Sequence, residues 1–180
     1  MMRLFIGLKL PDGIKSRLKT MRGGLPGARW VKPVNMHLTL RFVGEVDTQK
    51  AEDIHRALEG IKAQPFDIEF QGLGTFGHGY KMRALWASVV PSPQLSYLQT
   101  KIESAVVRSG QLIGTRKFTP HVTVARFSYS KPDRLQSFIE GNNLFKAGPF
   151  HVGQFTLFES RLGKEAPVYI PLIDYDLSQD

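Results

Sequence analysis

Residues 35–42 read NMHLTLRF and residues 119–127 read TPHVTVARF, and these two stretches share one pattern. Each contains a histidine that is followed two positions later by a threonine, with apolar residues between and after them. Alternate side chains of a strand point to opposite faces, so each histidine shares a face with its threonine. The sequence therefore predicts two strands that each carry a polar pair on one side and a core surface on the other.

The rest of the chain repeats in the same way, since each half reads strand, proline, helix, strand, helix, strand. Apolar patterning predicts strands at residues 3–10, 36–43, 66–76, 85–90, 118–127, 150–162 and 168–174. Helical periodicity predicts helices between Pro11 and Gly23, from Thr48 as N-cap to Ile61, between Ser92 as N-cap and Gly110, and from Asp133 to Glu140.

This duplication indicates a single domain over residues 1–180, with an approximate internal repeat of 3–77 and 83–162 and a closing strand at 166–174. Two copies are too few for a solenoid. We expect an α+β fold with two pseudo-symmetric lobes, mainly antiparallel sheets and helices on the outside. The two polar faces would then meet in a groove between the lobes.

Composition narrows the class of protein. The formal net charge of +8 and the pI near 9.8 indicate a polyanionic partner, and nucleic acid fits this charge. The absence of cysteine excludes disulfides, zinc–thiolate sites and cysteine nucleophiles, and it agrees with a reducing compartment. The N-terminal segment lacks the long apolar core of a signal peptide, and no stretch approaches about 18 consecutive apolar residues. We therefore expect a cytoplasmic protein that does not enter a membrane.

Two histidines and two threonines in one groove suit chemistry on a phosphodiester. A neutral histidine can take a proton while a protonated one gives a proton to a leaving oxygen, since the ordinary pKa of histidine is about 6.5. Threonine hydroxyls can donate hydrogen bonds to the non-bridging oxygens of a phosphate. A single His-x-Thr motif is weak evidence, but two copies at matching places in a repeat favour a catalytic pair. Carboxylates are sparse near both motifs, so we expect neither a metal nor another cofactor.

The motifs HLTL and HVTV resemble the signature of the 2H phosphoesterase superfamily, and in particular its RNA 2′,3′-cyclic phosphodiesterase (2′-5′ RNA ligase) family. The resemblance covers nearly the whole chain through the ordered segments RLFIGLKLP, NMHLTLRFVGEV, GLGTFG, RALWASV, FTPHVTVARF and FTLFESRL. It implies a bilobal fold with the active site between the lobes. It also implies opening of a terminal 2′,3′-cyclic phosphate to a 2′-phosphate, with joining or cleavage of 2′-5′ linkages in RNA as a second activity.

By match to the family motifs, His37 and His121 are the catalytic pair, and Thr39 and Thr123 bind the phosphate. We expect His37 to be the proton donor and His121 the proton acceptor, although the pseudo-symmetry leaves the reverse assignment open. Arg126 matches an arginine that the family places near the phosphate. Strict alternation puts Arg126 on the face opposite His121, so this role requires the strand to twist or end there.

Three aromatic residues are candidates for stacking against a base, namely Phe42, Phe76 and Trp30. Phe42 has the same difficulty with strand alternation as the arginine, and packing into the core is an equally good explanation for Phe42 and Phe76. Arg41 departs from the small or apolar residue that the family has at this position. From the groove face, Arg41 would add a contact to phosphate.

The expected partner is RNA that ends in a 2′,3′-cyclic phosphate, such as a tRNA-like fragment or an oligonucleotide, and the expected state is a monomer. A small cyclic nucleotide or an ADP-ribose cyclic phosphate is an alternative substrate. A non-catalytic module that binds RNA ends is an alternative from a different class. Four cations near the strands of the second lobe are more often a solvated face, but they could guide an RNA backbone by charge: Lys81, Arg83, Arg116 and Lys117.

Overall fold

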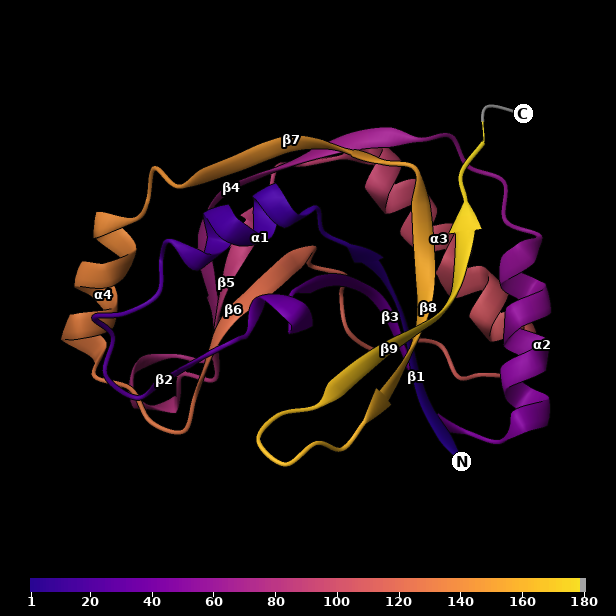
Figure 1. Ribbon diagram of the computed structural model, residues 1–180, viewed down its shortest axis with the longest axis horizontal. Helices are drawn as coiled ribbons and strands as arrows, with labels where there is room; N and C mark the ends of the chain where they lie inside the picture. The colour runs from indigo at the N-terminus through magenta and orange to yellow at the C-terminus, as the bar shows by residue number, and fades with distance from the viewer. Residues whose placement is uncertain (179–180) are drawn as a thin grey trace.

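Two antiparallel sheets form the centre of the molecule, and the helices pack outside them (Figure 1). The computed structural model describes residues 1–178. The first sheet has the order β3-β1-β8-β9, and its strands are β1 (Met2–Lys9), β3 (His37–Val46), β8 (Gln154–Arg161) and β9 (Val168–Asp176). The second has the order β2-β6-β5-β4-β7, and its strands are β2 (Ala28–Trp30), β4 (Phe66–Phe76), β5 (Ala84–Val89), β6 (His121–Phe127) and β7 (Lys146–Val152). The predicted α+β class with antiparallel sheets is confirmed.

Four α-helices connect these strands. They are α1 (Asp12–Lys19), α2 (Thr48–Glu59), α3 (Pro93–Arg108) and α4 (Pro132–Gly141), and two short 3₁₀ turns are η1 (Pro33–Asn35) and η2 (Gly79–Lys81). Helices α2 and α3 lie side by side at one end of the molecule, and α4 lies at the other end (Figure 1). Within residues 1–178, no helix has the length and apolar character needed to cross a membrane.

The helix starts follow from their capping residues. Ser92 caps α3 as predicted, because its hydroxyl accepts a hydrogen bond from the backbone N–H of Leu95 at 3.1 Å, and Pro93 takes the first helical position. Helix α2 begins at Thr48, but its cap is Asp47, whose carboxylate accepts from the N–H of Lys50 at 2.7 Å. The prediction of Thr48 as the cap was therefore wrong by one residue.

The two halves of the chain are interleaved rather than separate. Strand β4 belongs to the first half but pairs with β5 and β7, whereas β8 belongs to the second half and pairs with β1 and β9. The predicted single strand at residues 150–162 is therefore two strands, which separate at Gly153, because one strand cannot pair with both sheets. The orders β3-β1-β8-β9 and β6-β5-β4-β7 match position by position.

The matching orders place β3 and β6, the two strands with the histidine motifs, in equivalent positions of the two sheets. Each pairs with the strand that opens its own half, β1 or β5. Strand β1 supports β3 through Leu4, Ile6 and Leu8, which are almost completely buried, and burial of each side chain contributes about 1.5–3 kcal/mol. Strands β3 and β6 also lie against each other across the two sheets.

Candidate active site

The two motif strands alternate as the sequence predicts. In β3, His37 and Thr39 are half-buried, while Leu38 is fully buried on the other face. In β6, His121 and Thr123 are half-buried between apolar neighbours that are fully buried. Each strand therefore presents a polar pair to the space between the sheets and an apolar surface to the core.

A β-bulge in β6 decides where Arg126 lies. Thr123 and Ala125 pair with consecutive residues of β5, which leaves Val124 as an extra residue in the strand. One extra residue shifts the alternation by one, so Arg126 returns to the face of His121. Arg126 is exposed there, whereas Val124 and Ala125 are buried. Strict alternation was wrong for this residue because it assumed an unbroken ladder.

Strand β3 has the same bulge at the equivalent place. Thr39 and Arg41 pair with consecutive residues of β1, which leaves Leu40 unpaired in the ladder. Phe42 is thereby returned to the face of His37, where its side chain is 67% exposed. The position that holds an arginine in one motif strand holds an aromatic ring in the other.

His37 lies among aromatic side chains and is held through both ring nitrogens. Its ring centroid is 4.8 Å from that of Phe5 and 4.9 Å from that of Tyr169, which meets it edge-on. Nδ1 is 2.9 Å from the backbone oxygen of Asn35, and Nε2 is 2.9 Å from the hydroxyl of Thr39. Because a carbonyl only accepts, Nδ1 carries the hydrogen in the neutral ring and Nε2 is free to accept a proton.

His121 repeats this arrangement in the second sheet. Its Nδ1 is 2.6 Å from the backbone oxygen of Thr119, two residues earlier, so its Nε2 is likewise the free nitrogen. Its ring lies edge-on to Phe76 at 4.9 Å and tilted against Trp86 at 5.4 Å. Both histidines are therefore fixed in one tautomer by the chain that leads into their strands.

Burial is the main influence on the charge of both rings. It lowers the pKa of His37 from 6.5 to about 4, with an opposing effect from the Asn35 hydrogen bond and smaller lowering effects from the charges of Arg126 and Lys15 and from His121 when that ring is protonated. Burial also lowers the pKa of His121, and the charge of Arg126 adds to this while the bond to Thr119 opposes it. Arg126 therefore acts electrostatically on both rings, and both are neutral at pH 7 in the unliganded protein.

The structure brings some predicted residues to this site and leaves others away from it. The ring of Phe76 lies edge-on to His121, and Phe42 lies on the same face of β3 as His37. Trp30 does not, because it pairs with the buried Ala125 of β6 and packs its ring against Phe138 of α4 at 5.8 Å. The expectation that Arg41 faces the groove is wrong, since the bulge turns it to the other face of β3.

Four further residues of the site were not singled out from the sequence: Phe5, Trp86, Tyr169 and Lys15. Phe5 and Trp86 lie on β1 and β5, the strands beside each motif, so the duplicated segments around them held a usable signal. Tyr169 comes from β9, far along the chain, and no local pattern connects it with His37. Lys15 lies on α1, half-buried near His37.

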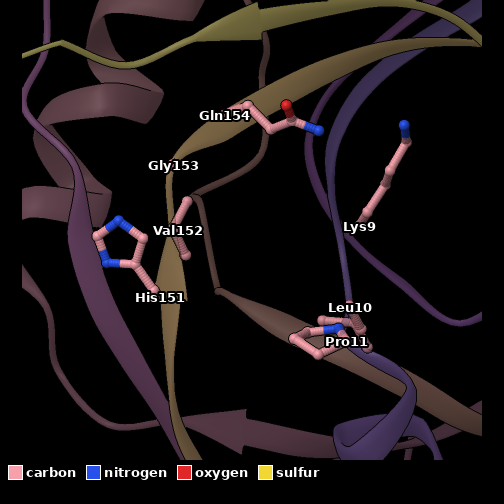
Figure 2. Close-up of a pocket in the computed structure, with 7 residues that line it drawn as sticks. All are labelled: Lys9, Leu10, Pro11, His151, Val152, Gly153 and Gln154. Carbon is pink, nitrogen blue, oxygen red and sulfur yellow. The ribbon is translucent and has the colours of Figure 1, made fainter.

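A separate pocket of about 250 Å³ lies where the end of β1 meets the junction of β7 and β8 (Figure 2). It is lined by Lys9, Leu10, Pro11 and residues 151–154, and neither motif histidine contributes to it. In residues 1–178, no group of three or more histidine and carboxylate side chains is placed to hold a metal ion. The chemistry of the site is therefore assigned to the two motif strands and not to this pocket.

Comparison with known proteins shows the family of this chain. Two curated relatives are named RNA 2′,3′-cyclic phosphodiesterase. The protein of Thermotoga maritima is 32% identical over 177 residues, covering 93% of this chain and 91% of the relative, and that of Archaeoglobus fulgidus is 30% identical over 174 residues, covering 93% and 96%. The crystal structure of E. coli LigT complexed with 3′-AMP is similar with a TM-score of 0.80 at 25% identity, covering 99% of both chains. The family model of the 2′-5′ RNA ligase superfamily matches residues 10–164, and the chain belongs to this superfamily.

Proposed function

We propose that this protein hydrolyses the 2′,3′-cyclic phosphate at the end of an RNA to a 2′-phosphate, by acid–base catalysis between two histidines and without a metal. The observation that carries this proposal is the pair of bulged His-x-Thr strands. They carry two histidines whose Nε2 atom is unprotonated in the neutral ring, two threonine hydroxyls and one arginine, and Arg126 and His121 are close enough to act electrostatically on His37. The names of the Thermotoga and Archaeoglobus relatives support the same reaction.

In the proposed reaction, water attacks phosphorus and the bond from phosphorus to the 3′ oxygen breaks. Nε2 of His121 takes a proton from the attacking water, and Nε2 of His37 gives a proton to the departing 3′ oxygen. The products are a 2′-phosphate and a free 3′-hydroxyl, and proton exchange with solvent resets the two rings. The reverse assignment of the two histidines uses the same geometry and is the alternative.

Binding of the phosphate anion favours the protonated form of His37 that this cycle needs, and the proton comes from solvent. Arg126 and the hydroxyls of Thr39 and Thr123 are the proposed contacts to the non-bridging oxygens. The unliganded His37 has a low pKa, but a negative charge within about 4–6 Å favours the charged form of a histidine and therefore raises its pKa. The substrate thus promotes protonation of the histidine that must act as the acid.

The same site can join RNA if a 5′-hydroxyl replaces water. That hydroxyl attacks phosphorus, the bond to the 3′ oxygen breaks, and a 2′-5′ linkage forms with the same proton transfers. Phe42 and Phe76 are the proposed base-stacking residues, since the ring of Phe76 lies edge-on to His121 and Phe42 is exposed on the same face of β3 as His37. Trp30 has no part in this proposal. The monomeric state and the cytoplasmic location stay predictions.

The test uses an oligonucleotide with a 2′,3′-cyclic phosphate end, incubated with the protein in EDTA. We expect a 2′-phosphate product, identified by ³¹P NMR and by mass spectrometry. His37→Ala and His121→Ala should each reduce kcat by about 10²–10⁴-fold while substrate binding weakens only modestly. A 3′-phosphate product, or a strict requirement for a metal, would contradict the proposal.

The same purified protein distinguishes this proposal from two alternatives, a small cyclic phosphate as substrate and a module that binds RNA ends without catalysis. A panel of mononucleoside cyclic phosphates and an ADP-ribose cyclic phosphate, compared by kcat/KM with the oligonucleotide, identifies the substrate class. A non-catalytic module would bind the RNA end without turnover, so neither alanine variant would have any activity to lose. RNA is proposed over the small substrates because of the net charge of +8.

A further inference from the structure

Arg41 holds the loop that leads from α3 into the motif strand β6. On the face of β3 away from the histidine, its Nε lies 2.5 Å from a carboxylate oxygen of Glu103 on α3. Its guanidinium also donates to the backbone oxygen of Leu112 at 2.5 Å and to that of Phe42. The side chains of Arg41 and Glu103 are only 15% and 23% exposed. Three separate parts of the chain therefore meet on one guanidinium.

Glu103 completes this anchor from the other side. Its second carboxylate oxygen accepts a hydrogen bond from the backbone N–H of Gly114 at 2.8 Å. The pair thus holds the loop 109–120, between α3 and β6, at two points. A planar guanidinium is suited to such multiple contacts, and loss of either partner would leave a mostly buried charge without its counterion.

The anchored loop presents an apolar and cationic surface. Leu112 and Ile113 are 88% and 70% exposed, and Arg116 and Lys117 are also exposed. Residues 109–120 contain no carboxylate, and they run directly into His121. Phe42, whose side chain is exposed, lies close to the loop, since one guanidinium donates to the backbone oxygens of both Phe42 and Leu112. We call this surface, made of Phe42, Leu112, Ile113, Arg116 and Lys117, the loop surface.

The corresponding segment in front of His37 is held by the connection between β8 and β9, although the side chains of Lys32 and Glu165 stay 60% and 81% exposed. There, Lys32 forms an ion pair with Glu165 at 3.1 Å, and the side chain of Asn35 donates to the backbone oxygen of Pro167 at 3.0 Å. Both partners lie in the connection between β8 and β9. Of the two segments that lead into the motif strands, one is thus held by the β8–β9 connection and the other by Arg41 and Glu103.

We propose that the loop surface binds the nucleotides on the 5′ side of the cyclic phosphate, and that Arg41 and Glu103 are positioning residues that hold it. This inference rests on the proposed function, because it takes the substrate to be an RNA end. Exposed cations complement the phosphates of a single strand, and apolar and aromatic side chains can pack against its bases. The surface continues directly into the site, so an RNA chain that leaves the phosphate can follow it.

The test compares two substrates, an oligonucleotide with a 2′,3′-cyclic phosphate end and a mononucleoside 2′,3′-cyclic phosphate. The double variant Arg116→Ala/Lys117→Ala should raise KM for the oligonucleotide by on the order of tenfold, because two phosphate contacts are lost. It should leave kcat and the kinetics of the mononucleotide unchanged. The slope of log(kcat/KM) against log[salt] for the oligonucleotide should become shallower by about 0.7 per lost contact.

A matched control removes one lysine and one arginine from exposed positions elsewhere in the chain. The double variant Lys131→Ala/Arg134→Ala changes the net charge equally, at exposed positions at the start of α4. It should leave the preference for the oligonucleotide close to that of the wild type. An equal rise of KM in the control would show a general charge effect and overturn the inference.

The positioning role is tested with Arg41→Met/Glu103→Met, which releases the loop without leaving an unpaired buried charge. We expect faster amide hydrogen exchange in residues 111–117 and the same selective rise of KM for the oligonucleotide. The inference is overturned if this variant and Arg116→Ala/Lys117→Ala both reduce kcat/KM equally for the two substrates. It is also overturned if neither variant changes kcat/KM for either substrate. If the wild type hydrolyses neither substrate, the proposed function fails, and the inference fails with it.

Discussion

The buried position of His37 predicts how the stability of the protein depends on pH. Its pKa is lowered from 6.5 to about 4 in the folded state, chiefly by burial, whereas the unfolded chain keeps the ordinary value. The unfolded state therefore binds more protons between these two values. The stabilising contribution of the neutral ring is fully present above pH 6.5 and is lost as the pH falls toward about 4.

The size of this effect follows from the shift. A displacement from 6.5 to about 4 corresponds to about 3 kcal/mol in total, and about 2 kcal/mol of it is lost between about pH 7 and pH 5. His121 contributes in the same direction, because burial lowers its pKa as well. The variant His37→Gln keeps a neutral polar side chain at the same place and removes only the titration of this one ring.

The measurement is the free energy of unfolding in urea, taken for the wild type and for His37→Gln from pH 7.5 to 4.5. We expect the wild type to lose about 2 kcal/mol more than the variant between about pH 7 and pH 5, with equal m-values. The contributions of His121 and of the carboxylates cancel in this comparison, since both proteins contain them. Parallel curves would refute the reasoning, because His37 would then titrate alike in the folded and unfolded states.

Three other predictions concern the site. Binding of inorganic phosphate at about pH 7 should take up protons, since the anion raises the depressed histidine pKa values, and calorimetry in buffers of different ionisation enthalpy measures this uptake. Arg126→Met should weaken phosphate binding and raise the pKa of both histidines in NMR titrations, because its charge lowers both. Gly74→Ala should cost about 1–3 kcal/mol of stability and lower kcat, because its Cβ would lie 2.2 Å from the ring of Trp86, which packs against His121. Gly13→Ala, with nothing within 4 Å of its Cβ, is the control, and equal effects of the two alanines would contradict this explanation.

Much of the fold was readable from local patterns. The alternation in the two motif strands, the cap at Ser92 and the succession of strands and helices depend on neighbouring residues, and the structure agrees with them. The interleaving of the halves was not readable. Strands β4 and β8 have suitable patterns for either sheet, and only packing of the complete chain decides with which sheet each one pairs.

The positions of individual site residues were less predictable than the motifs. Tyr169 reaches His37 from β9, and Arg41 is held by Glu103 on α3, so both contacts join segments that are distant in sequence. Trp30 looked suitable for stacking because of its residue type alone. Its half-buried ring packs against Phe138, since Trp30 pairs with Ala125, whose side chain faces the core.

The opening motifs show the division between sequence and tertiary structure. The sequence by itself determined that His37 shares a face with Thr39, and His121 with Thr123, because a period of two is a property of a single strand. It left Phe42 and Arg126 on the wrong face. In the tertiary structure a bulge after each threonine places both residues on the same strand face as the histidine. A bulge exists only in the register of hydrogen bonds with a partner strand, and that register is set by β1 and β5, which lie far away in the chain.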